Sequence, residues 1–132
     1  MDRKLIALVV PSLMILSIII GCKKDNPTPL QILTSHTWHV KSYSQGNYVV
    51  NSGCSVEQYF TFSTNGTGVE FDQCPVDTQA TFNYFLSADN KTIFWYYPGS
   101  NAHDTAAIEQ LNNQTLEILY KGYWEDYIFY AK

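Results

Sequence analysis

The sequence predicts an all-β domain, an eight-stranded antiparallel up-and-down barrel or half-open barrel, that follows a signal peptide and a short linker. Three observations support this prediction. All 20 aromatic residues of the chain lie after residue 21, and aromatic and β-branched residues favour strands. From residue 37 onward, several segments alternate apolar with polar residues. Turn-forming pairs such as Asn65-Gly66 and Asn112-Asn113 separate these segments at intervals of roughly 8–12 residues.

Residues 1–21 have the pattern of a bacterial signal peptide. Two cations in the first four residues precede the apolar run 5–20, which is shorter than the about 20 residues of a membrane-spanning helix. Residues 19–22, Ile-Ile-Gly-Cys, resemble the lipobox of bacterial lipoproteins. This resemblance implies cleavage before Cys22 and a membrane anchor of diacylglycerol and palmitate on that cysteine. The alternative is an uncleaved anchor in which Cys22 is incidental.

Residues 22–30 form a polar, Pro-rich tether that connects the anchor to a single domain, residues 31–132. The Lys-Lys-Asp sequence at 23–25 resembles the surface-export signal of Bacteroidetes lipoproteins, so we expect a cell-envelope protein of the outer membrane. Whether the domain is periplasmic or surface-exposed stays open at this stage.

The charge of the mature chain excludes one class of partner. Residues 22–132 keep six of the eight basic residues and eleven of the twelve acidic ones, which gives a formal net charge of −5. Nucleic acid is therefore not an expected partner, because binding phosphates requires a surplus of Lys and Arg.

The two cysteines of the domain, Cys54 and Cys74, predict a disulfide in an oxidising compartment. They flank a hairpin expected at Asn65-Gly66. Strict alternation would place them on opposite faces of the sheet, but Gly53 and Pro75 indicate that both lie just outside the strands. A metal site is the alternative, although two cysteines without a Cys-x-x-Cys spacing are poor evidence for zinc.

Short links between the predicted strands favour a meander, in which successive strands are neighbours. Closing eight strands into a barrel removes exposed edges, and its interior is just wide enough to be filled by side chains or to hold one small ligand. The predicted strands are 37–44, 55–63, 68–73, 80–87, 92–97, 105–111, 115–120 and 124–131.

Alternation within these strands predicts which side chains share a face. The residues expected inside the barrel are Trp38, Phe60, Phe62, Phe71, Phe82, Tyr84, Leu116 and Ile118. The aromatic residues expected on the outer face are Tyr59, Phe85, Phe94, Tyr96 and Tyr127. Outer aromatic residues could dock a protein or a glycan. Alternatively, a bulge could shift the register and change the face on which they lie, or a short helix near residues 30–33 could cover them.

Two segments carry a resemblance to a known family. Residues 33–40, Leu-Thr-Ser-His-Thr-Trp-His-Val, resemble the opening of lipocalin-like domains, where a Gly-x-Trp element begins the first strand and its Trp closes one barrel end; His36 stands in place of the Gly. Residues 59–68, Tyr-Phe-Thr-Phe-Ser-Thr-Asn-Gly-Thr-Gly, are similar to a hairpin of Bacteroidetes lipocalin-like lipoproteins. The resemblance spans residues 31–131 and implies a lipocalin-like barrel that binds a small apolar or amphipathic molecule.

The sequence gives little sign of catalysis. His36 and His39 would point to opposite faces of one strand, His103 is expected in a loop, and no serine has a nucleophile-elbow motif. Carboxylates are expected on the solvated outer face; they are Glu57, Glu70, Asp72, Glu125 and Asp126. We therefore expect a binding protein without a metal or cofactor, and not an enzyme. A cavity above about 300 Å³ would favour a ligand in the barrel, and a solid interior would favour an interaction module.

Overall fold

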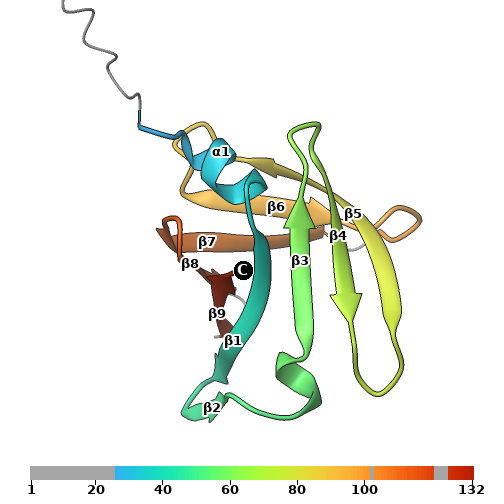
Figure 1. Ribbon diagram of the computed structural model, residues 1–132. Helices are drawn as coiled ribbons and strands as arrows, with labels where there is room; N and C mark the ends of the chain where they lie inside the picture. Colours follow the sequence, from blue (N-terminus) through green and yellow to red (C-terminus); the bar gives the residue numbers. More distant parts are fainter. Residues whose placement is uncertain (1–25, 102, 121–124) are drawn as a thin grey trace, which may run out of the picture.

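The computed structural model describes residues 26–101, 103–120 and 125–132. Its nine strands form one antiparallel sheet that closes where β1 (Thr37–Gln45) pairs with β9 (Glu125–Ala131). Eight strands make the barrel, as predicted, and β2 (Tyr48–Val50) extends the sheet beside β1 (Figure 1). The other strands are β3 (Gln58–Phe62), β4 (Thr67–Asp72), β5 (Thr78–Leu86), β6 (Thr92–Tyr96), β7 (His103–Leu111) and β8 (Thr115–Tyr120).

From β3 to β9 each strand pairs with the next one along the chain, which is the predicted meander. Two local differences from the prediction stand out. The strand expected from residue 55 begins at Gln58, because Cys54–Val56 form the short 3-10 helix η1. The strand β2 was not predicted; its residues pair with the far end of β1 across a turn at Gly46, whose φ is +58°.

Several predictions concern residues outside the described part of the chain. These are the signal peptide, residues 1–21, the lipidated Cys22, the first residues of the tether, and Trp124 at the predicted start of the last strand. Within the described ranges, no helix has the length and apolar character required to cross a membrane.

The α-helix α1 (Pro29–Thr34) lies across one end of the barrel (Figure 1). Its first turn is fixed by a capping box. The Gln31 amide donates to the Thr28 hydroxyl at 3.2 Å, and the Thr28 amide donates to the Gln31 side-chain oxygen at 2.8 Å. Pro29 follows the cap, at a position where a helix needs no amide donor. The short helical turn expected near residues 30–33 is therefore present.

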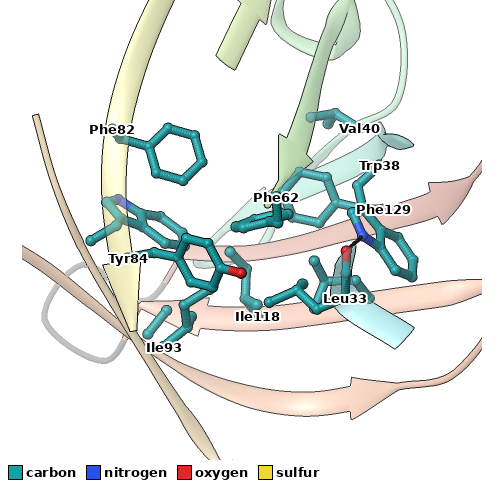
Figure 2. Close-up of a cluster of buried hydrophobic side chains, with 12 residues drawn as sticks. Leu33, Trp38, Val40, Phe62, Phe82, Tyr84, Ile93, Ile118 and Phe129 are labelled. Carbon is teal, nitrogen blue, oxygen red and sulfur yellow. Dashed lines mark hydrogen bonds between the residues drawn. The ribbon is translucent and has the colours of Figure 1, made fainter. Parts of the chain in front are cut away.

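The helix closes this end of the barrel through Leu33 and Trp38, which are both fully buried. The Trp38 indole Nε1 donates to the Leu33 carbonyl oxygen at 2.8 Å, so the polar atom of the buried ring is satisfied (Figure 2). Trp38 thus holds the place that the family resemblance implied for it. The rest of the buried core comprises Val40, Phe62, Phe82, Tyr84, Ile93, Trp95, Ala106, Leu116, Ile118 and Phe129.

The β3–β4 hairpin places Phe71 on the outer face, so its expected position in the interior is wrong. Phe62 pairs with Gly68 and the Ser63 amide donates to the Thr67 carbonyl oxygen, so the turn itself has three residues, 64–66. This odd number pairs Phe60 with Glu70 and Tyr59 with Phe71. The prediction assumed the opposite parity across the turn. Glu70 consequently points into the barrel, which also corrects its predicted place on the solvated face.

At position 68 of β4 the interior has no space for a side chain. Gly68 is buried, and a Cβ atom built there would lie 2.2 Å from Cζ of Phe82. The rings of Phe62 and Phe82 fill this part of the barrel and meet edge to face at 5.5 Å. The aromatic residue of β4, Phe71, lies on its outer side, where the sequence alone did not place it.

Tyr127 is a second correction, because it faces inward although it was expected on the surface. It pairs with Ile118 of β8, whose side chain is buried, and it packs against the core. On its other edge, β9 pairs with β1, and the register of this pair shifts between Val40 and Ser42. The resulting bulge places Tyr43 on the same face as Tyr127.

The predicted disulfide between Cys54 and Cys74 is present, with the two Cα atoms 5.1 Å apart. Both cysteines lie outside the strands, Cys54 in η1 and Cys74 just after β4. Because neither cysteine is part of a strand, the strict alternation that would put them on opposite faces does not apply. The disulfide lies at the end of the barrel opposite α1.

Candidate binding site

The barrel contains a cavity of about 210 Å³. It is smaller than the about 300 Å³ set as the threshold for an apolar ligand pocket, and the interior is not solid either. The residues that line it are Gln58, Phe60, Phe62, Glu70, Ile93, Trp95, Tyr97, Asp104, Leu116, Ile118, Tyr120, Tyr127 and Phe129.

The lining changes character along the barrel axis. Phe62, Ile93 and Leu116 come from the strand ends near α1, and they form an apolar floor. The polar lining residues come from the opposite strand ends, which we call the mouth. The cavity therefore combines an apolar interior with a few polar groups at one end, as small-molecule sites commonly do.

Two carboxylates lie in the mouth, Glu70 on β4 and Asp104 on β7. The Tyr97 hydroxyl donates a short hydrogen bond to Glu70 Oε2. The Trp95 indole Nε1 donates to Asp104 Oδ2 at 3.2 Å. Each carboxylate is thus oriented by a neighbouring aromatic residue, and each keeps further acceptor capacity, because a carboxylate offers about four lone-pair sites.

The tyrosine hydroxyls of the cavity stay protonated at neutral pH. Burial raises the pKa of Tyr97, and the hydrogen bond and charge of Glu70 raise it further. Burial also raises the pKa of Tyr120, with a contribution from the charge of Asp104. Both rings therefore present hydroxyl donors in a region of negative potential.

Most residues expected inside the barrel are there. Phe60, Phe62, Leu116 and Ile118 line the cavity. Trp38, Phe82 and Tyr84 are buried in the core around it. Tyr120, which shares the parity of Leu116 and Ile118, lines the cavity as well, whereas the polar lining residues Gln58, Glu70, Tyr97 and Asp104 were not predicted. Asp104 has the same parity as the buried Ala106, which indicates an inward side chain, but β7 begins two residues before the predicted strand 105–111.

On the outer face, four rings stack side by side across four strands. Tyr130 stacks on His39 at 5.4 Å, His39 on Tyr59 at 5.1 Å, and Tyr59 on Phe71 at 4.4 Å, with interplanar angles of 12–26°. Burial lowers the pKa of His39, and so does the charge of Lys132, which keeps the imidazole neutral within the stack. We call these four residues the outer ladder.

The other aromatic residues expected on the outer face are also paired. Phe85 stacks on Phe94 at 4.6 Å across β5 and β6, and Tyr96 lies 5.5 Å from the ring of His103. Such cross-strand pairs stabilise a sheet by contacts between ring faces. These contacts cover part of each paired ring, while Tyr48, Phe85, Tyr96 and Tyr130 stay exposed to solvent.

The histidines do not take part in the cavity. His36 packs edge-on against Trp38, His39 belongs to the outer ladder, and His103 lies beside Tyr96. Among the described residues, no group of three His, Cys, Asp or Glu side chains is arranged to hold a metal ion.

Comparison with known proteins supports the fold. No protein-family model and no curated protein sequence matches the chain. A crystal structure of a lipocalin-like protein from Bacteroides uniformis is similar, with a TM-score of 0.63 and 14% sequence identity, over 75% of this chain and 98% of that one. A crystal structure of an uncharacterized protein from Bacteroides eggerthii gives a TM-score of 0.59 and 13% identity, over 74% and 98% of the two chains.

These likenesses establish the class of protein to which the geometry points: an all-β barrel of the lipocalin-like fold with one added strand. This is the fold that the hairpin motifs of the sequence implied. At such low identities the likeness concerns the fold alone, so the function must be argued from the cavity itself.

Proposed function

We propose that the protein is a lipid-anchored protein of the bacterial cell envelope that binds a small molecule inside its barrel. The observation that carries the proposal is the cavity of about 210 Å³, with an apolar floor and a polar mouth. The anchor rests on the lipobox-like residues 19–22, and binding in place of catalysis stays a prediction.

Access to the cavity supports binding from one side. Leu33 and Trp38 are fully buried at the α1 end and close it, so a ligand would enter through the mouth. An apolar portion of the ligand would displace water from the floor at Ile93 and Leu116, and each Å² of apolar surface buried contributes about 25 cal/mol. The polar groups of the mouth would fix its orientation.

The alternative, a solid-cored module that docks a protein or glycan through outer aromatics, has less support. The interior contains a cavity, and the ring faces in the outer ladder are largely occupied by one another. Sugars stack on free ring faces, which the central rings His39 and Tyr59 do not offer. Replacing Tyr59 and Phe94 by Ser tests this alternative: loss of a detected partner with an intact fold would support it.

Native mass spectrometry of the detergent-solubilised protein, purified from its source, tests ligand binding. We expect a co-purifying small molecule of defined mass. The matched variant is Ile118→Trp, because Ile118 lines the cavity and an indole there would occupy its volume. Loss of the adduct in this variant, with far-UV circular dichroism and cooperative thermal unfolding retained, supports binding in the barrel; an adduct that persists places it elsewhere.

The anchor is tested separately by Cys22→Ser. Because the lipid is proposed on the sulfur of Cys22, this variant should no longer incorporate radiolabelled palmitate and should leave the membrane fraction. Cys54→Ser is the control, since Cys54 forms the disulfide and should not affect labelling. Equal labelling of the Cys22→Ser variant and the unaltered protein would rule out the anchor.

A further inference from the structure

The charge of the cavity narrows the kind of ligand that it fits. Glu70 and Asp104 both contribute carboxylates to the lining, and among the described residues none that lines the cavity is Lys, Arg or His. Tyr97 donates one hydrogen bond to Glu70, and Trp95 donates one to Asp104, but both donors are neutral. The two negative charges therefore have no compensating positive charge within the described lining.

The walls beside these carboxylates are aromatic. The Trp95 and Tyr120 ring centroids are 5.4 Å apart at 75°, and those of Tyr120 and Tyr127 are 5.6 Å apart at 74°. These three rings pack edge to face on one another and together form one aromatic wall of the cavity, which we call the aromatic cage. Ring faces attract cations, most strongly when the site is desolvated, and such cages are known to hold organic ammonium groups.

We propose that the cavity binds an organic ammonium ion, a small molecule with a protonated amine on an aromatic or aliphatic body. This inference rests on the proposed function, since it requires that the cavity holds a ligand at all. The amine lies in the aromatic cage between Glu70 and Asp104, and the body lies on the apolar floor. A cavity of about 210 Å³ lies below the roughly 300–1,000 Å³ of drug-sized sites, so the ligand is smaller than a typical drug.

Ligands of other charge fit less well for electrostatic reasons. A carboxylate or phosphate would face Glu70 and Asp104, and like charges that lie close together disfavour each other. A neutral apolar ligand would displace water from the two carboxylates without replacing its hydrogen bonds, which carries a large desolvation cost. A protonated amine donates up to three hydrogen bonds and neutralises part of the charge.

Isothermal titration calorimetry on the full-length protein in detergent tests the inference with three probes of one shape. These are 2-phenylethylamine, which is protonated at pH 7, the neutral 2-phenylethanol, and the anionic 3-phenylpropanoate. We expect the amine to bind about ten- to a hundredfold more tightly than the alcohol, since charge-assisted hydrogen bonds supply the difference. The anion should not bind measurably.

Two isosteric variants locate the charge preference. Glu70→Gln and Asp104→Asn should each weaken binding of the amine about tenfold and leave that of the alcohol within about twofold. Glu109→Gln is the matched control, because Glu109 lies on the same strand as Asp104 but is exposed on the outside of the barrel. It should leave the affinity for the amine unchanged.

The outcomes separate the two proposals. If the alcohol or the anion binds as tightly as the amine, the ammonium inference is wrong while ligand binding by the cavity stands. If the amine binds equally well to the unaltered protein and to both carboxylate variants, the inference is also wrong. If no probe binds at millimolar concentration and native mass spectrometry finds no adduct, both proposals fail together. The comparison of probes needs no variant, so a variant that fails to fold does not remove the test.

Discussion

The two ends of the barrel are built from residues of different chemical character. At the closed end, Leu33 and Trp38 are fully buried, and the single polar atom of the indole ring is satisfied by a backbone carbonyl. At the mouth, Glu70 and Asp104 bring charge beside a water-accessible cavity, which costs stability unless a partner compensates it. We therefore expect the closed end to contribute more to the stability of the fold than the mouth, where we propose that a ligand binds.

The strongest test of this contrast is Trp38→Ala at the closed end. Removing a buried indole should lower the free energy of unfolding by about 3–5 kcal/mol, measured by urea denaturation. Tyr127→Phe at the mouth is the comparison, and we expect it to cost less than about 1 kcal/mol, because it removes only a hydroxyl. Similar losses in both variants would show that the two ends share the stability equally.

The disulfide is the main covalent contribution at the mouth end. It joins residues that are 20 positions apart in sequence, so replacing both cysteines by Ser should cost about 3 kcal/mol in the chain-entropy model. Thermal unfolding of the double variant measures this, and the unaltered protein in reducing buffer should behave in the same way. A loss below about 1 kcal/mol would mean that packing alone fixes the ends of β3 and β4.

Close packing beside the closed end is tested by Gly68→Ala. The new methyl group would collide with the Phe82 ring, which is buried and cannot turn away, so we expect a loss of about 1–3 kcal/mol. The double variant Gly68→Ala with Phe82→Leu should be less destabilised than the sum of its single changes. Strict additivity of the two losses would show that this collision does not occur.

The smallest effect concerns carboxylates on the outside of the barrel. Burial raises the pKa of Glu117, and so do the charges of Asp126 and Glu109. The folded state thus binds the carboxyl proton of Glu117 more tightly than the unfolded chain does. Protonated Glu117 therefore stabilises the fold below the ordinary pKa of 4.5, and this stabilisation is lost as the pH rises through the raised pKa. At pH 7, Glu117→Gln should stabilise the protein by a few tenths to about 1 kcal/mol.

The pH dependence provides the control for this variant. Well below pH 4.5 the Glu117 carboxyl is protonated and resembles the amide, so the stabilisation by Glu117→Gln should disappear in melting curves at acid pH. Glu57 is exposed, and Glu57→Gln should change the stability little at either pH. A gain for Glu117→Gln that is the same at both pH values would assign it to packing rather than to charge.

The sequence predicted the strands well because alternation is a local property. The ranges 92–97 and 115–120 agree with β6 and β8 to within one residue. The short turns between the strands correctly predicted that successive strands pair. The same locality explains what could not be predicted. Which face of one strand joins which face of the next depends on the number of residues in the loop and on bulges, and a change of one residue reverses every side chain.

Phe71 and Tyr127 show that loop lengths and bulges decide which face a side chain takes. The resulting errors affected the predicted site more than the predicted fold. The three-residue loop at 64–66 reversed β4, and with it Glu70 entered the barrel while Phe71 left it. The bulge in β1 lies beside Tyr127. The polar residues of the mouth were thus hidden from the sequence analysis, since a carboxylate in an alternating strand is normally solvated, and only the closed arrangement brings Glu70 and Asp104 into one cavity.

The position of α1 also has a consequence for capture of the ligand. The chain enters the domain through this helix, at the pole opposite the opening, and only residues 23–28 separate Cys22 from it. The seven Cα–Cα steps from Cys22 to Pro29 span at most about 25 Å when fully extended. With the acyl chains proposed for Cys22 embedded in a bilayer, the barrel would be held by its sealed pole, and its carboxylates would face the aqueous phase. Solutes would then be taken from the surrounding water and not extracted from the lipid.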